Sequence, residues 1–233
     1  AIDPQSVEAV IAASRVRTRP LRQARDWGYQ RIAAGATVVQ VDAAPPPVAR
    51  LAEAGCASTG AIEISDGPLR LIVNCGGAGL EGAWISRDLA QGLRTTAAHS
   101  TLVLNDSNST ALLPDGTLGK GVTEVELNRQ ELDNGSRLDL SHDGYVRRLG
   151  YVHRRLLLVS GDGREGRGED MLTPAERRKK PGKQPVQLRF HLAPGVEPTL
   201  TADSQGALLR IDLGALWQFR TGAGVLSVED SLW

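Results

Sequence analysis

The sequence predicts an all-β protein: an antiparallel β-sandwich (supersandwich-like) with one short N-terminal helix. Two observations predict this fold. From residue 29 onward, short runs of alternating apolar and polar residues recur roughly every 8–15 residues, as in sandwich strands. The runs are separated by turn chemistry, to which the 26 glycines and 12 prolines of the 233-residue chain contribute.

Residues 5–14 form the one convincing helical pattern. Ser6 follows Pro4 and is a suitable N-cap, and Val7, Val10 and Ile11 fall on one face of a helix. The first strand is expected at residues 37–42, and the three prolines at 45–47 end it because proline has no N–H for a sheet.

Further strands are expected where alternation continues between turn signals. Asp66-Gly67-Pro68 and Asp133-Asn134-Gly135 predict two hairpin turns. The expected strands are 60–65, 69–75, 100–106, 122–128, 136–141, 153–160, 186–192, 207–213, 217–220 and 225–228.

Residues 164–185 are expected to form an exposed loop. The segment contains three prolines and the basic run Arg177-Arg178-Lys179-Lys180. Two interpretations stay open: a solvated insertion, or a local patch for an acidic glycan.

Composition limits the function classes. The 27 basic and 27 acidic side chains cancel, so overall charge gives no case for binding nucleic acid. No apolar run approaches a membrane span, and two cysteines, Cys56 and Cys75, do not make a disulfide scaffold. Because the chain begins at Ala1 and stops at Trp233, within what reads as a strand, we expect a fragment of a longer protein.

A series of motifs in order resembles one family. They are Trp27-Gly28-Tyr29-Gln30-Arg31, Ala61-Ile62-Glu63-Ile64-Ser65, Ile72-Val73-Asn74-Cys75-Gly76, Thr96-Ala97-Ala98-His99-Ser100-Thr101, His142-Asp143-Gly144-Tyr145, Tyr151-Val152-His153-Arg154-Arg155, Gly168-Glu169-Asp170, Arg189-Phe190-His191-Leu192 and Trp217-Gln218-Phe219-Arg220. Together they are similar to the C-terminal sandwich of bacterial heparinase II/III-like polysaccharide lyases. The resemblance assigns residues 25–233 to that sandwich and residues 1–24 to a helix or linker from a preceding helical domain.

The resemblance implies a two-domain lyase that cleaves uronate-containing acidic polysaccharides by β-elimination. Such chemistry requires neutralisation of the uronate carboxylate, a base for the C5 proton and an acid for the leaving oxygen. In the family an α/α-toroid domain carries most of the catalytic residues, so this chain alone is expected to be inactive. The expected partners are an acidic polysaccharide and that toroid, and the expected location is the periplasm or cell envelope.

The resemblance also implies a metal site in the sandwich. The family's three ligand positions fall on His99, Cys56 and Asn74. Cysteine is a good zinc ligand and asparagine a poor one, so zinc is a candidate cofactor at an altered site. The other interpretation of His99 is a structural histidine at a strand start. A catalytic histidine of some members falls on Ala54.

Four residues are candidates for substrate binding: His142, Tyr145, His153 and Arg154. His142 and Tyr145 could face a glycan from a strand end, or Asp143-Gly144 could form a turn with Tyr145 packed on the sandwich. An arginine beside His153 could bind a carboxylate or sulfate, although alternation sends only one of Arg154 and Arg155 toward the core.

A rival hypothesis is a carbohydrate-binding or structural sandwich whose parent protein has lost lyase chemistry. Ala54, Cys56 and Asn74 favour it. Whether the parent is an enzyme is left open by this sequence, and the residues of the preceding domain would discriminate the two hypotheses.

Overall fold

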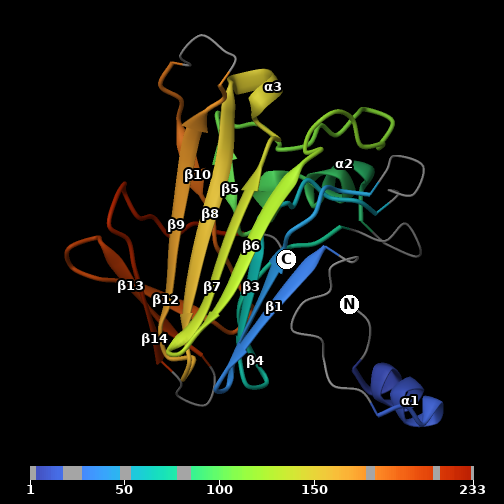
Figure 1. Cartoon of the computed structure of the whole chain (residues 1–233), viewed down its shortest axis with the longest axis vertical. Coiled ribbons are helices and arrows are strands. Elements are labelled where there is room, and N and C mark those ends of the chain that lie inside the picture. The colour runs from blue at the N-terminus through green and yellow to red at the C-terminus, as the bar shows by residue number, and fades with distance from the viewer. Residues whose placement is uncertain are drawn as a thin grey trace.

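A computed structural model describes residues 4–17, 28–47, 54–77, 85–176, 182–211 and 216–231. Within these ranges the protein consists of antiparallel strands with a few short helices (Figure 1). The predicted all-β sandwich with one N-terminal helix is confirmed. None of the helices in these ranges has the length and apolar character needed to cross a membrane.

A five-stranded sheet forms the N-terminal part of the sandwich. Its order is β1-β2-β3-β4-β11, with every pair antiparallel. Its strands are β1 (Tyr29–Ala34), β2 (Thr37–Asp42), β3 (Ile62–Asp66), β4 (Leu69–Val73) and β11 (His191–Leu192). The tight turn at Gly67-Pro68 joins β3 to β4, as the hairpin signal predicts.

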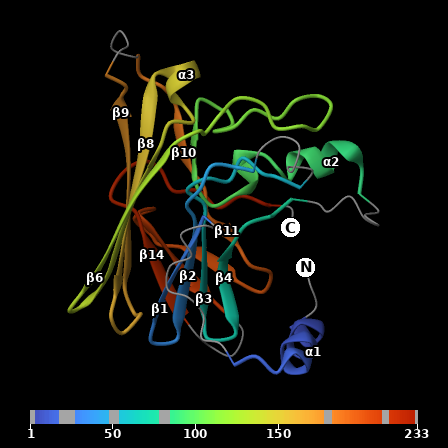
Figure 2. The same ribbon diagram turned by 45° about the vertical axis from the view of Figure 1, so that its right-hand side comes forward.

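A four-stranded sheet stands along one side of the molecule (Figure 2). Its strands follow in chain order: β6 (Val125–Leu132), β7 (Gly135–His142), β8 (Tyr151–Ser160) and β9 (Gly166–Pro174). Smaller sheets pair β10 (Val186–Leu188) with β5 (Leu102–Leu104), and join β12 (Glu197–Leu200), β13 (Gly206–Arg210) and β14 (Leu216–Arg220).

The helices are short. They are α1 (Pro4–Ser14), α2 (Arg87–Gly92), the 3-10 turn η2 (Thr96–Ala98) and α3 (Val146–Leu149). Helix α1 begins at Pro4, before Ser6, so Ser6 is not its N-cap. Val7, Val10 and Ile11 are exposed.

One apolar cluster joins the three larger sheets. It includes Val41 of β2, Leu140 of β7, Leu157 of β8 and Leu209 of β13. Burial alternates along β8 with a period of two, because one face of the strand points into this core. The burial of leucine, valine and isoleucine, with few aromatics, supplies most of the apolar contact between the sheets.

Several element predictions were wrong. The segment 164–185 was expected to be a loop, but β9 occupies much of it as an edge strand paired only with β8. The expected strand at 186–192 is divided between β10 and β11, which belong to different sheets, and 225–228 is not a strand. Strands β1 and β12 were not expected. The basic run 177–180 lies outside the described residues.

The turn between β8 and β9, which contains Gly163, touches the turn between β1 and β2 in the other large sheet. Its φ is +74°, and a Cβ there would lie 2.0 Å from the carbonyl oxygen of Ala34. Thr37 Oγ1 donates to the Gly163 carbonyl at 2.8 Å. The close approach of the β1–β2 turn therefore requires glycine.

We expect Gly163→Ala to lower the free energy of unfolding by about 3 kcal/mol, because left-handed strain and a backbone clash add. Gly67→Ala is the matched control: its φ is +55°, and a Cβ added there would meet no atom within 4 Å. The control should lose about 1 kcal/mol. Urea denaturation of both variants measures this, and equal losses would contradict the proposed clash.

Candidate functional site

Three of the four residues predicted to bind substrate lie inside the sandwich. His142 ends β7 and pairs with His153 of β8, and Tyr145 precedes α3. The exposed fractions of His142, His153 and Tyr145 are 2%, 1% and 1%. The Tyr145 hydroxyl donates to the Leu102 carbonyl at 2.8 Å, so its position agrees with the packed-turn interpretation. Substrate contact by these three residues stays a prediction.

The two histidines form a directed chain of hydrogen bonds. The Gly144 N–H can only donate, so His142 Nδ1 accepts it at 3.2 Å and the ring proton sits on Nε2. His142 Nε2 then donates to His153 Nδ1 at 2.9 Å, and His153 Nε2 donates to Asp170 at 2.6 Å. This arrangement uses both imidazoles in their neutral form.

Asp170 also binds Arg155, and this buried pair links two layers of the sandwich. The Arg155 Nε and Nη2 donate to the two Asp170 oxygens at 2.8 and 3.1 Å. Arg155 Nη1 donates to the carbonyls of Gly60 and Ser100 at 2.6 and 3.1 Å. We call His142, His153, Arg155 and Asp170 the interior polar cluster.

Burial and charge set the ionisation of this cluster. Burial lowers the pKa of His142 well below its ordinary value, and the neighbouring His153 and Arg155 add to the effect. Burial also lowers the pKa of His153, against the opposing effect of Asp170. Burial alone would raise the pKa of Asp170, but Arg155 and the hydrogen bond from His153 outweigh it and lower the pKa to about 2. The cluster therefore holds one ion pair and two neutral imidazoles.

Arg154 lies on the opposite face of β8 and is exposed, as strand alternation predicts for one of the two arginines. Its Nε donates to Asp139 at 2.7 Å, and Arg137 donates to the same carboxylate at 2.8 Å. A shallow groove of about 310 Å³ surrounds it, lined by Glu126, Leu127, Asn128, Asp139, Ser141 and Arg154. Arg154 is thus paired with a carboxylate, and substrate binding by it stays a prediction.

The three predicted metal ligands each make other contacts. His99 is buried, and its Nδ1 donates to the Thr95 carbonyl at 2.7 Å. Asn74 accepts the Ser100 N–H at 2.7 Å, and its amide donates to the Ile62 carbonyl at 3.4 Å. Cys56 donates to the Ala54 carbonyl at 3.5 Å.

The donor set is a poor match to zinc, because an asparagine amide is a weak ligand for it. His99 keeps its Nε2 lone pair, and the Asn74 oxygen accepts the Ser100 N–H. Among the residues described, no group of three or more histidine, cysteine, aspartate or glutamate side chains is placed to hold an ion. Zinc stays a prediction here, and no step of chemistry is assigned to it.

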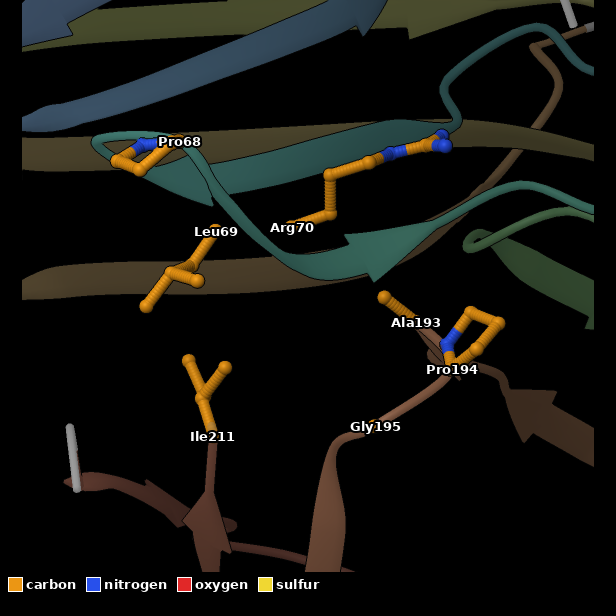
Figure 3. A pocket seen from close by; sticks show the side chains of 7 residues that line it. All are labelled: Pro68, Leu69, Arg70, Ala193, Pro194, Gly195 and Ile211. Atoms are coloured by element: carbon orange, nitrogen blue, oxygen red, sulfur yellow. The ribbon is translucent and has the colours of Figure 1, made fainter. Parts of the chain in front are cut away.

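A second hollow lies between the β3–β4 turn and the segment that follows β11 (Figure 3). It has about 310 Å³ and is mostly apolar. Its lining is Pro68, Leu69, Arg70, Ala193, Pro194, Gly195 and Ile211. No titratable residue of the interior polar cluster lines it.

The sequence points to His142 and His153 as candidates but gives less signal for the partners that define their role, Arg155 and Asp170. Alternation along 153–160 placed one arginine toward the core, which is Arg155. Asp170 carries no such signal, because the glycines and the proline of β9 make this strand resemble a loop. Its motif, Gly168-Glu169-Asp170, points to it only through the family resemblance.

By its fold the protein is an antiparallel β-sandwich that encloses the interior polar cluster. The sequence places it in a family: residues 16–233 match the family described as "Heparinase II/III-like, C-terminal". The chain belongs to that family.

One curated relative is FtsZ-localized protein C of Caulobacter vibrioides, which is 30% identical in an alignment 251 residues long, gaps included. The alignment covers 99% of this chain and 41% of the relative. Two solved structures share the fold. The heparan sulfate lyase HepC of Pedobacter heparinus has a TM-score of 0.62 at 16% identity, over 89% of this chain and 30% of that one. A heparinase III structure has a TM-score of 0.65 at 17% identity, over 91% and 31%. The chain thus spans less than half of each.

We expect Asp170→Asn to lower the free energy of unfolding by about 3–5 kcal/mol, because Arg155 would lose its counter-ion in the interior. Asp139→Asn, which removes the carboxylate between Arg137 and Arg154 on the outer face, should lose about 1 kcal/mol. Urea denaturation of the two variants checks this difference. Similar losses in both would contradict a special role for the buried pair.

Acid should destabilise the protein below about pH 6.5. Burial lowers the pKa of all four histidines in the folded state, so the unfolded chain takes up protons first as the pH falls. Stability is therefore complete above the ordinary histidine pKa and falls below it, by up to about 1.4 kcal/mol per pH unit for each histidine. Urea denaturation at pH 7.5, 6.5 and 5.5 measures the slope. A stability that does not change across this range would refute the neutral histidine pair.

Proposed function

We propose that this chain is the sandwich of a larger polysaccharide lyase that cleaves uronate-containing glycans, and that it braces the substrate cleft while another domain supplies most of the chemistry. The family match over residues 16–233 supports the lyase class. The shared fold with a heparan sulfate lyase agrees with it.

The observation that supports the non-catalytic role is the burial of three side chains that the sequence predicts to bind substrate. Histidine and tyrosine are the side chains best suited to move the C5 proton and to protonate the leaving oxygen. Here His142, His153 and Tyr145 are each at most 2% exposed and hydrogen-bonded inside the sandwich. Groups so placed are suited to structural support, so in this proposal the base and acid belong to a preceding α/α-toroid.

A second candidate is a non-catalytic module, either carbohydrate-binding or structural, in a protein that has lost lyase chemistry. The identity to FtsZ-localized protein C, 30%, exceeds the 16–17% to the solved lyases. Ala54, Cys56 and Asn74 depart from the family's site, which also favours this candidate. Its parent would then work with FtsZ, whereas the lyase would work in the periplasm or cell envelope.

We expect the full-length protein to release unsaturated uronate from heparan sulfate or another uronate polymer, followed by ultraviolet absorbance. The 233-residue chain alone should release none, because the groups that transfer protons would be missing. A parallel binding assay with purified FtsZ tests the second candidate. If the full-length protein binds FtsZ and releases no unsaturated uronate from any uronate polymer, the first candidate is rejected in favour of the second.

We also propose a zinc site at His99, Cys56 and Asn74, and this proposal rests on the family resemblance alone. Metal analysis of the protein beside His99→Ala tests it. Stoichiometric zinc that disappears with His99 would support the site, and its absence from both proteins would reject it.

A further inference from the structure

Cys75 and His191 form a thiol–imidazole pair at the end of the five-stranded sheet, where β11 lies beside β4 (Figure 2). Cys75 follows β4, and His191 opens β11. The Cys75 Sγ lies 3.4 Å from His191 Nδ1, within hydrogen-bond range for sulfur. Both residues are partly exposed, so solvent reaches this corner of the fold.

The ring nitrogens of His191 have assigned roles because one of them contacts a backbone carbonyl. His191 Nε2 lies 2.9 Å from the Ala97 oxygen, which can only accept, so Nε2 carries the proton. The neutral ring therefore carries its one acceptor lone pair on Nδ1, which lies 2.9 Å from the Ser231 hydroxyl oxygen and 3.4 Å from the Cys75 sulfur. A base held in this tautomer by a third group is the arrangement that activates a nucleophile.

Ser231 covers the pair from the segment that follows β14. Its Oγ lies 2.9 Å from His191 Nδ1 and 3.9 Å from Cys75 Sγ. Because Nδ1 can only accept in this tautomer, the Ser231 hydroxyl donates to it and competes with the thiol. Ser231 is exposed, and displacement of its side chain frees Nδ1 to take the thiol proton.

Cys56 provides a comparison within the same chain. It is also a free, partly exposed cysteine, and its Sγ donates to the carbonyl of Ala54 at 3.5 Å. Burial raises the pKa of its thiol, while Arg94 and the Gly77 N–H oppose that effect by favouring the thiolate. A carbonyl accepts a hydrogen bond from the thiol and cannot remove its proton. Because the thiolate is the nucleophile in exchange with disulfides, a neighbouring base distinguishes Cys75 from Cys56.

We propose that Cys75 is a site of thiol–disulfide exchange with low-molecular-weight disulfides, with His191 as its general base. The S–H proton passes to His191 Nδ1 while the Cys75 sulfur attacks one sulfur of the disulfide. A bond forms between Cys75 and that sulfur, the disulfide S–S bond breaks, and the proton goes to the departing thiolate. Cys75 is oxidised and the departing sulfur is reduced, so the electrons balance. This inference does not depend on the lyase proposal.

The test compares the two cysteines in the full chain. Oxidised glutathione is the reagent, and peptide mass spectrometry follows the mixed disulfide at each position. We expect Cys75 to react at least about tenfold faster than Cys56, since positioned bases commonly contribute more than that. Equal rates, or a faster Cys56, would overturn the proposal even if no variant could be prepared.

His191→Gln is the decisive variant. A glutamine amide can donate to the Ala97 carbonyl in place of Nε2 but offers no base to the thiol. The Cys75 rate should fall at least about tenfold, with the Cys56 rate unchanged. Ser231→Ala is the matched control and should keep or raise the Cys75 rate. An unchanged Cys75 rate in His191→Gln, with a native circular dichroism spectrum, would show that His191 is not the base.

Discussion

The buried ion pair of Arg155 and Asp170 is the constraint on which the arrangement of the sandwich depends. A guanidinium in the interior must have its donors satisfied, since an unpaired buried charge costs several kcal/mol. Asp170 satisfies one side, and the carbonyls of Gly60 and Ser100 the other. The ion pair therefore fixes two features of the fold. It requires the register of β9 against β8 in which Asp170 lies opposite Arg155. It also requires that the segments containing Gly60 and Ser100 approach β8, because their carbonyls accept from Arg155.

The inward-facing residues of β8 are polar in the first half of the strand and apolar in the second half. His153 and Arg155 lie toward α3, whereas Leu157 and Val159 belong to the apolar cluster shared by the three larger sheets. The polar half includes the neutral histidines, whose hydrogen bonds run in one direction to Asp170. A proton added to His153 would place a donor opposite the donor of His142. This conflict reinforces the effect of burial and makes the pair suited to structure rather than to proton transfer.

Local chemistry explains which elements could be predicted from the sequence. The Asp66-Gly67-Pro68 turn and the alternation through 153–160 are local signals, and both elements formed as expected. Strand β9 lacks such a signal, because an edge strand paired on one side tolerates Gly166, Gly168 and Pro174. Asp170 was missed with it. In 186–192, alternation continues while the chain changes sheets near Arg189, whose N–H donates to Thr101, a long-range contact that no local pattern specifies.

Asn74, one of the three predicted metal ligands, connects strand ends through the hydrogen bonds of its side chain. Its amide oxygen accepts the Ser100 N–H and its nitrogen donates to the Ile62 carbonyl, so one side chain links β3, β4 and the segment after η2. An aspartate could accept the first bond but could not donate the second. Ser100 continues the link, since its hydroxyl donates to Val73 and accepts the His191 N–H. Hydrogen bonds therefore connect the strand ends at this corner.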